Sequence, residues 1–136
     1  DYDSSGLLLI TNHGELTNRL LHPSFKVAKE YLVTTNGQTL SSEEIKNFCN
    51  GLELDDGLTA KCQLKKLAKP LTYSVTLSEG RKRQVRRMFA FFGRKVVSLH
   101  RIRFGPLEIG NLRPGELREL KQQEKAALLK AAGLQN

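Results

Sequence analysis

The most regular hydrophobic pattern in the chain lies within residues 79–93. Apolar side chains recur there with the i, i+3, i+4, i+7 spacing that marks one buried face of a helix. These positions are Val85, Met88, Phe89 and Phe92. Gly93 follows the last of them, where a left-handed residue commonly ends a helix. The pattern therefore predicts an amphipathic helix that ends at Gly93.

Other apolar patterns predict strands. The continuous apolar run at residues 7–12 favours a strand that is buried on both faces. Alternating or near-alternating patterns predict further strands over 25–35, 59–66, 72–77 and 95–104. In the strand at 59–66, the side chains expected to face inward are Ala60, Cys62 and Leu64.

The apolar phase of the last of these strands slips between Leu99 and Ile102. A slip of this kind is typical of an extra residue in one strand, so we expect a bulge near His100 and Arg101.

Three further helices are predicted. Ser41 and Glu44 have the spacing of a capping box, in which each residue bonds to the other's main chain at the start of a helix. Gly133 is expected to stop the last helix. The helices are expected over 15–21, from Ser41 to about Asn50, and over 122–132. Together with the strands they indicate an α+β fold with a mixed, mainly antiparallel β-sheet and flanking helices. With no repeat or linker, residues 1–136 are expected to belong to one domain.

The charge balance points to a polyanionic partner. The chain has 22 Lys+Arg against 14 Asp+Glu, a formal net charge of +8. Nucleic acid is the first candidate for such a surface and an anionic membrane is the second. A membrane-bound helix would need an exposed apolar face, whereas the apolar face of 82–92 is expected to be buried. We therefore expect no membrane partner.

Motifs for cofactors and metals are absent from the sequence. There is no glycine-rich phosphate loop, no metal-ligand spacing and no nucleophile elbow. Cys49 and Cys62 lack a C-x-x-C pattern or a neighbouring histidine, which favours a reducing, cytoplasmic setting over a disulfide or zinc site. No cofactor and no metal are expected. The function classes that remain are a nucleic-acid binder and an enzyme that uses side chains alone, such as a carboxylate nucleophile.

Basic residues occupy the polar side of the helix in 79–93. Arg83 and Arg87 are expected to point away from the apolar face, towards solvent or a polyanion. Arg86 falls about 100° from Val85, at the border of that face. A half-buried guanidinium requires a partner, which predicts an inward arginine paired with a carboxylate. The alternative is an ordinary amphipathic helix with a solvated cationic face.

Residues 1–12, Lys29-Glu30-Tyr31 and residues 79–88 stand in order and at consistent spacing, and together they resemble the bacterial ribosomal-RNA pseudouridine synthases. Residues 1–12, DYDSSGLLLITN, are similar to the family's first motif, which runs from a catalytic aspartate into a leucine run. Lys29-Glu30-Tyr31 matches its Lys-x-Tyr motif, and residues 79–88, EGRKRQVRRM, match its third. The resemblance covers nearly the whole chain.

The resemblance implies an enzyme that isomerises a stem-loop uridine of ribosomal RNA to pseudouridine without a cofactor. Asp1 would be the catalytic aspartate, Arg86 its ion-pair partner, and Tyr31 the residue that lies against the target base. The candidates for contacts with the RNA backbone are Lys29, Arg81, Lys82, Arg83 and Arg87. A monomer is expected.

The sequence departs from the family at two places. His13 stands where the family usually has an acidic residue, at a turn where we expect little effect. The Gly-Arg-Leu that precedes the family's aspartate, whose arginine helps to extrude the uridine, is absent. We therefore expect the chain to be the C-terminal portion of a catalytic domain, without upstream strands or an N-terminal RNA-binding domain. The alternative function is a non-catalytic basic RNA-binding module associated with the ribosome.

Overall fold

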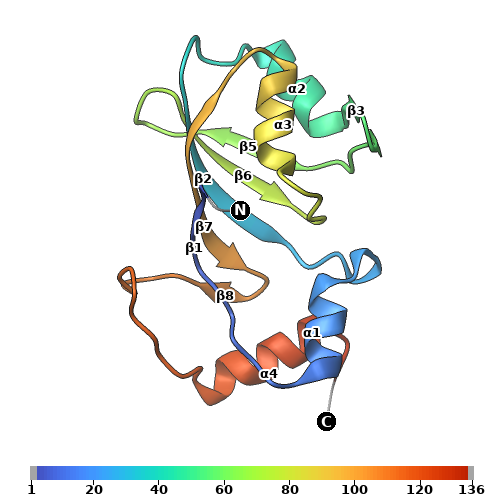
Figure 1. Cartoon of the computed structure of the whole chain (residues 1–136), viewed down its shortest axis with the longest axis vertical. Coiled ribbons are helices and arrows are strands. Elements are labelled where there is room, and N and C mark those ends of the chain that lie inside the picture. Colours follow the sequence, from blue (N-terminus) through green and yellow to red (C-terminus); the bar gives the residue numbers. More distant parts are fainter. Residues whose placement is uncertain (1–2, 135–136) are drawn as a thin grey trace.

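The structure of the chain is a computed structural model that describes residues 3–134 (Figure 1). Its main sheet has the strand order β1-β7-β2-β6-β5, and β8 pairs with β7 outside this path. The strands are β1 (Ser5–Gly6), β2 (Lys29–Thr35), β5 (Gln63–Lys66), β6 (Thr72–Leu77), β7 (Val96–Phe104) and β8 (Leu107–Glu108). β1 runs parallel to β7 and the other neighbours are antiparallel. The expected α+β fold with a mixed, mainly antiparallel sheet is confirmed.

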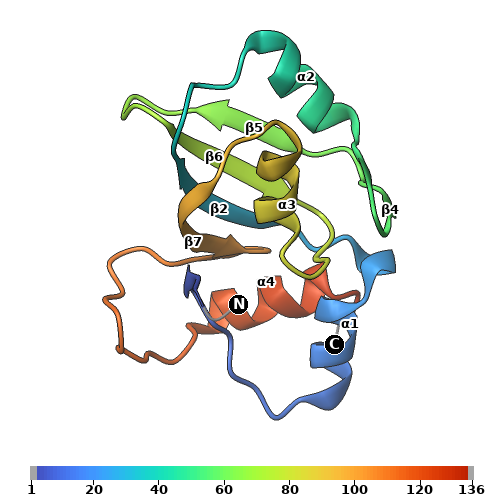
Figure 2. The same ribbon diagram turned by 45° about the horizontal axis from the view of Figure 1, so that its top comes forward.

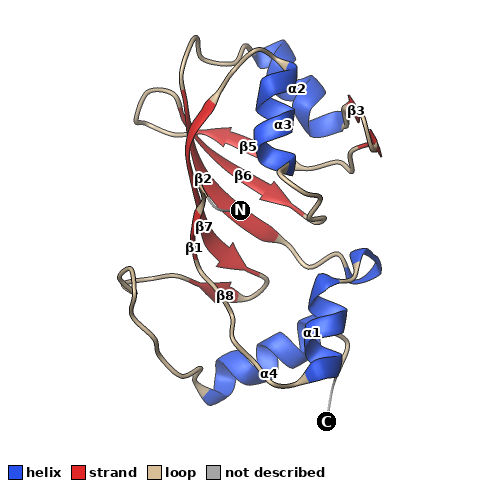
Figure 3. Ribbon diagram, viewed as in Figure 1, coloured by secondary structure: helices blue, strands red, loops and turns tan. Residues whose placement is uncertain are grey.

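The helices form two groups at opposite ends of the sheet (Figures 1 and 3). Their bounds are α1 (Gly14–Leu21), α2 (Ser42–Asn50), α3 (Gln84–Phe91) and α4 (Gln122–Ala131), with a 3-10 helix at Pro23–Phe25. A small second sheet follows α2 and consists of β3 (Glu53–Leu54) and β4 (Gly57–Leu58). α2 and α3 lie beside β5 and β6, whereas α1 and α4 lie beyond β8.

Each helix group covers its own hydrophobic cluster. In the first, the Phe89 ring of α3 lies 5.1 Å from Phe48 of α2 and 5.3 Å from Tyr73 of β6, between ring centroids. The buried Tyr73 hydroxyl accepts the Leu40 N–H at 3.0 Å, so this aromatic ring keeps a polar partner inside the core. The second cluster joins α1, α4 and the β7–β8 end of the sheet, and Figure 2 shows its two helices apart from α2 and α3.

Several local predictions are confirmed. α3 buries Val85, Met88 and Phe89, and Gly93 adopts the left-handed conformation with φ +74°. The capping box of Ser41 and Glu44 is present at the start of α2. β6 covers residues 72–77 as expected. Opposite Glu30 and Tyr31, the partners on β7 jump from Arg103 to Arg101, which leaves Ile102 as the extra residue of the predicted bulge.

The predicted strand at residues 7–12 is wrong. Among the described residues before α1, only Ser5 and Gly6 form a strand with β7. The chain then leaves the sheet, with Leu8 and Ile10 73% and 72% exposed. The free edge of β7 beyond Arg101 is occupied by β8, which pairs at residues 103–104. A further strand could pair only with an unpaired edge, and β8 of the short β7–β8 hairpin occupies this edge of β7.

Two predicted strands begin later than expected. β2 starts at Lys29 instead of residue 25, because the 3-10 helix precedes it. β5 starts at Gln63, and Ala60 is exposed, contrary to the expectation that it faces inward. The buried residue there is Thr59. Its hydroxyl accepts the Leu52 N–H at 2.8 Å, so this segment is a loop bound to Leu52 and not a strand of the sheet.

Candidate active site

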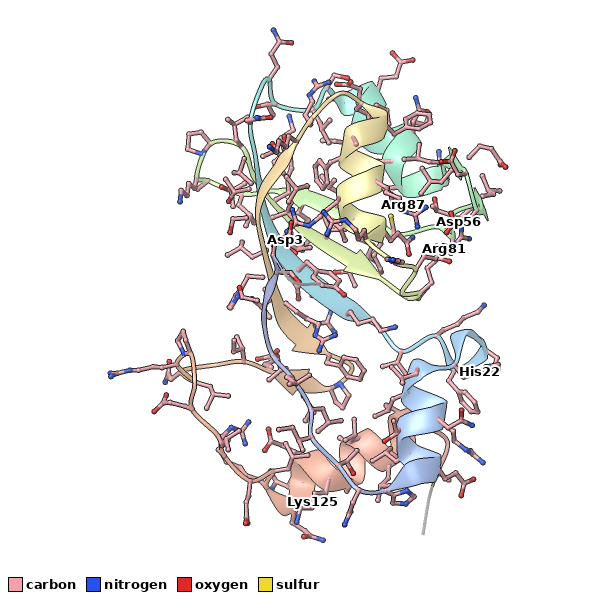
Figure 4. The ribbon with its side chains drawn as sticks, viewed as in Figure 1. Asp3, His22, Asp56, Arg81, Arg87 and Lys125 are labelled. Carbon is pink, nitrogen blue, oxygen red and sulfur yellow. The ribbon has the colours of Figure 1, made fainter. Side chains whose placement is uncertain are left out.

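The N-terminal segment lies against α3 through two arginines. Arg83, at the N-cap of α3, donates to the Asp3 carboxylate with Nη1–Oδ1 3.1 Å and Nη2–Oδ2 3.4 Å. Arg86 Nη2 donates to the main-chain oxygen of Asp3 at 2.8 Å and lies 3.5 Å from its Oδ1. Figure 4 labels Asp3, which lies two residues before β1. The hydrogen bond from Arg83 is the main cause that holds the pKa of the Asp3 carboxyl below its usual range.

Arg86 is buried much as the helical pattern predicted. Its side chain is 13% exposed, and Nη1 also donates to the Val96 carbonyl at 3.3 Å. Within residues 3–134, Nε has no hydrogen-bond partner. The carboxylate that the structure places beside Arg86 is that of Asp3. Asp1 lies outside the described residues, so its expected pairing with Arg86 stays a prediction.

A cleft of about 570 Å³ opens between β1, β2, β7 and the loop before α3. Tyr31 of β2 lies in the middle of the sheet, opposite Val75 of β6 and Arg101 of β7, and its half-buried side chain lines this cleft. Arg101 lines it as well and donates from Nε and Nη2 to the Leu7 carbonyl at 2.9 and 2.6 Å. The cleft therefore places an aromatic ring and cationic groups on one wall.

Lys29 lies on the same strand face as Tyr31 and also lines the cleft. The residue is only 9% exposed, and its Nζ lies 5.9 Å from the ring centroid of Phe104. Burial, followed by the nearby positive charge of Arg101, lowers the pKa of Lys29, and Glu79 opposes the shift. Lys29 therefore presents a largely desolvated cation to whatever enters the cleft.

Two basic residues of the third motif bind the β3–β4 turn. Arg87 binds Asp56 of the β3–β4 turn with both carboxylate oxygens, at 2.9 and 3.0 Å. Arg81 donates to the Gly57 and Leu58 carbonyls at 3.0 and 2.6 Å, and it pairs with Glu79 at 3.1 Å. Figure 4 shows Arg81, Arg87 and Asp56 together. The hydrogen bond from Arg87 is the main cause that lowers the pKa of Asp56 to about 2.

The helical pattern predicts that Arg87 points away from the apolar face, towards solvent or a polyanion. On that side the β3–β4 turn covers its guanidinium and leaves the side chain 32% exposed. Lys82 and Arg83 instead are exposed and line the cleft. Of the cations expected to contact RNA, Lys29, Arg81, Lys82 and Arg83 therefore line the cleft. Arg81 and Arg87 also attach the β3–β4 turn to α3 and to the loop before it.

Asp3, Asp56 and Arg101 are site residues that the sequence pattern did not identify. Each acts through a partner far away in the chain, and no local periodicity reports such a partner. The repeated acidic residue at positions 1 and 3 was the one available signal for Asp3. In the part of the chain that the structure describes, no group of three or more His, Cys, Asp or Glu side chains could hold a metal ion. None of the helices described is long and apolar enough to cross a membrane.

Comparisons with known proteins agree with this fold and these motifs. The family model described as RNA pseudouridylate synthase matches residues 1–91. An RNA pseudouridine synthase of Aquifex aeolicus, named as uncharacterized, is 42% identical over 137 residues, which cover 98% of this chain and 55% of that protein. Ribosomal large subunit pseudouridine synthase B of Bacillus subtilis is 40% identical over 129 residues, which cover 91% of this chain and 52% of that protein.

A crystal structure of a pseudouridylate synthase superimposes with a TM-score of 0.86 at 34% identity, covering 94% of this chain and 56% of the other. The chain spans about half the length of the curated relatives it matches. The resemblance expected from the three motifs is confirmed at the level of the family. A family match over residues 1–91, with the same fold in a solved relative, shows that the chain belongs to the RNA pseudouridylate synthase family.

Proposed function

We propose that the chain forms the catalytic face of an enzyme that isomerises a specific uridine of ribosomal RNA to pseudouridine. The observation that supports this most directly is the contact of Arg86 with the main chain of Asp3. It attaches the N-terminal segment, in which Asp1 stands, to the helix of the third motif. Ribosomal RNA as the substrate is supported by the name of the Bacillus subtilis relative.

The reaction needs no external oxidant or reductant. The C1′–N1 bond of uridine breaks, the base turns, C5 forms the new bond to C1′, and the proton lost from C5 is balanced by one taken up at N1. Asp1 is the proposed carboxylate that acts at the sugar or at the base, and the positive charge of Arg86 would favour its ionised form. The burial of the Arg86 side chain strengthens that effect, because charges interact more strongly where water is excluded.

Tyr31 is the proposed base-contacting residue. Its ring lines the cleft, where an extruded uracil could stack on it, and its hydroxyl is a proposed acceptor or relay for the C5 proton. Single-stranded or extruded bases are commonly held by aromatic side chains in this way.

The proposed contacts with the RNA backbone come first from Lys29, Lys82 and Arg83, which line the cleft together with Arg81. Phosphate contacts position an RNA without specifying its sequence. Arg81 and Arg87 were expected in the same role, and we propose for them a weaker, indirect contribution because Asp56 and Glu79 offset their charge. We further propose that the chain acts as a monomer in the cytoplasm, and light scattering of the free and RNA-bound chain would check the monomeric state.

The test is a single-turnover assay of tritium release from a ribosomal RNA fragment labelled at C5 of uridine, with protein in excess. Release of tritium with formation of pseudouridine is expected. A chain that binds the fragment and releases no tritium over the background would instead be the non-catalytic RNA-binding module.

Neutralising Asp56 should strengthen RNA binding. Asp56→Asn releases Arg81 and Arg87 from their carboxylate, so the plot of log K against log salt should steepen by about 0.7 for each additional phosphate that these arginines neutralise on single-stranded RNA. Asp55→Asn is the matched control, because it makes the same change in net charge at a neighbouring exposed residue that forms none of the hydrogen bonds to Arg81 or Arg87. Equal slopes for the two variants would contradict the proposed offset of charge by Asp56.

A further inference from the structure

Lys29 is a buried cation whose ammonium group lacks an acceptor. The residue is 9% exposed and lines the cleft, and within residues 3–134 its Nζ forms neither a hydrogen bond nor an ion pair. The contact that Nζ does make is with the face of Phe104, 5.9 Å from the ring centroid. Burial of a charged group is costly unless a partner pairs with it. Lys29 therefore requires an acceptor that the described residues do not supply.

The charged groups around Lys29 leave that acceptor to a ligand. After burial, the charges that act on the pKa of Lys29 are those of Arg101, which lowers it, and Glu79, which raises it. The Glu79 carboxylate already accepts three hydrogen bonds, from the Ala60 N–H at 2.7 Å, Gln84 Nε2 at 2.8 Å and Arg81 Nε at 3.1 Å. Arg101 adds a second cation to the same cleft. A ligand with exposed acceptor oxygens is the one that suits this wall.

We propose that Lys29 recognises the extruded uracil by donating a hydrogen bond to its O4 carbonyl oxygen, and that it thereby selects uridine over cytidine. This inference rests on the proposed function, in which the target base lies against Tyr31. It narrows the contact proposed for Lys29 from the RNA in general to the base itself, and it leaves the phosphates to Lys82 and Arg83.

Depth in the cleft favours the base over a phosphate as the partner of Lys29. Lys29 and Tyr31 lie on one face of β2, about 7 Å apart along the strand, and both line the cleft. Lys82 and Arg83 also line it but are exposed, so they meet phosphate groups that stay in solvent. In uracil, C4 lies opposite N1, the atom bonded to the ribose. A base that enters with its ribose at the mouth therefore brings O4 to the inner end, where Lys29 is buried.

The hydrogen-bonding groups of the two pyrimidines explain the selection. An ammonium group donates three hydrogen bonds and accepts none. Uracil presents a carbonyl oxygen at position 4, whereas cytosine presents an amino group, which is itself a donor there. Cytosine would leave the buried ammonium without an acceptor, and an unsatisfied charged group costs more than an unsatisfied neutral one.

The same contact is available before and after isomerisation. When C5 replaces N1 as the atom bonded to C1′, the ring atom opposite the sugar becomes C2. The carbonyl oxygen O2 then reaches the position that O4 held. Lys29 therefore has a carbonyl acceptor in both the substrate and the product, and the rotation of the base does not leave its charge unpaired.

Two substitutions change this contact and keep the fold. Lys29→Met replaces a buried charge by an unbranched apolar side chain of similar length, and such replacements are often neutral or stabilising. Gly80→Ala acts on the ammonium from outside. A Cβ on Gly80 would lie 3.6 Å from Lys29 Nζ, an ordinary van der Waals contact, and the φ of Gly80 lies outside the left-handed region. The added methyl group therefore covers one side of Nζ without strain.

The experiment measures the Kd of the unchanged chain and of Lys29→Met for uridine and cytidine octanucleotides, single-stranded RNAs with equal numbers of phosphates. The ratio of the two Kd values cancels the phosphate contacts. The unchanged chain should prefer the uridine octanucleotide, and Lys29→Met should lower this preference by about 10-fold, the effect of one hydrogen bond from a charged donor. Lys82→Met is the matched control, because it removes one positive charge from an exposed residue of the same cleft. It should weaken the binding of both octanucleotides by the same factor.

Equal losses of affinity for the two octanucleotides in Lys29→Met would make Lys29 a phosphate contact and overturn the inference. The absence of a uridine preference in the unchanged chain would overturn it as well. Gly80→Ala should lower the preference with Lys29 in place, and it decides the matter if urea denaturation shows that Lys29→Met does not fold; an unchanged preference in Gly80→Ala then contradicts the inference. If the preference depends on Lys29 in a chain that releases no tritium, the proposed isomerisation fails and the recognition of uracil stands.

Discussion

Replacing Asp1 by alanine should abolish the isomerisation and leave RNA affinity within about twofold of its starting value. A nucleophilic carboxylate has no substitute among the side chains of its site, and removal of a comparable nucleophile in other enzymes costs on the order of 10⁴-fold or more in kcat. Binding depends mainly on cations that contact phosphates, which the substitution does not touch. Tritium release with the RNA fragment in excess would measure kcat, and filter binding on the same fragment would measure the affinity.

Asp55→Ala is the matched control for this variant, because Asp55 is an exposed carboxylate away from the cleft. It should leave kcat unchanged. Equal turnover by the Asp1→Ala variant and the unchanged chain would remove Asp1 from the reaction. A loss of RNA affinity in parallel with kcat would indicate that Asp1 acts in binding.

Replacing Arg86 by alanine is expected to have the second largest effect, a loss of about 100-fold or more in kcat. Removal of one charged donor aimed at a reacting group typically costs about 10²–10³ in rate. The variant also loses the contacts with the carbonyls of Asp3 and Val96, which should lower the free energy of unfolding by about 1 to 3 kcal/mol. Urea denaturation and the tritium-release assay below the unfolding range would separate stability from catalysis.

Arg94→Ala is a close control for Arg86→Ala. The two arginine side chains are 14% and 13% exposed and line the same cavity, but Arg94 is bound to Glu44. Arg94→Ala should destabilise the fold by a similar amount and leave kcat unchanged. If both variants lose the same fraction of kcat, the effect of Arg86 is structural and its proposed role beside Asp1 is wrong.

The sequence by itself determined the elements whose signals are local. The apolar face of α3, its end at Gly93, the capping box of α2 and the bulge opposite Tyr31 depend on residues close together in the chain, and each was predicted. The burial of Arg86 follows from the same periodicity, because its angular position relative to the apolar face is a property of the helix alone. The motifs added the family, which the comparisons confirm.

Only the tertiary structure decided which distant groups meet. The apolar run at 7–12 has the composition of a strand, but β8 occupies the edge of β7 that this run would have needed. Arg87 was expected to face solvent or a polyanion, and the β3–β4 turn brings Asp56 to it. Asp3 reaches both Arg83 and Arg86. Hydrophobic periodicity specifies which side of an element is buried and contains no information about the partner of a charge on its other side. That partner depends on loops and strand order, which form only when the whole chain packs.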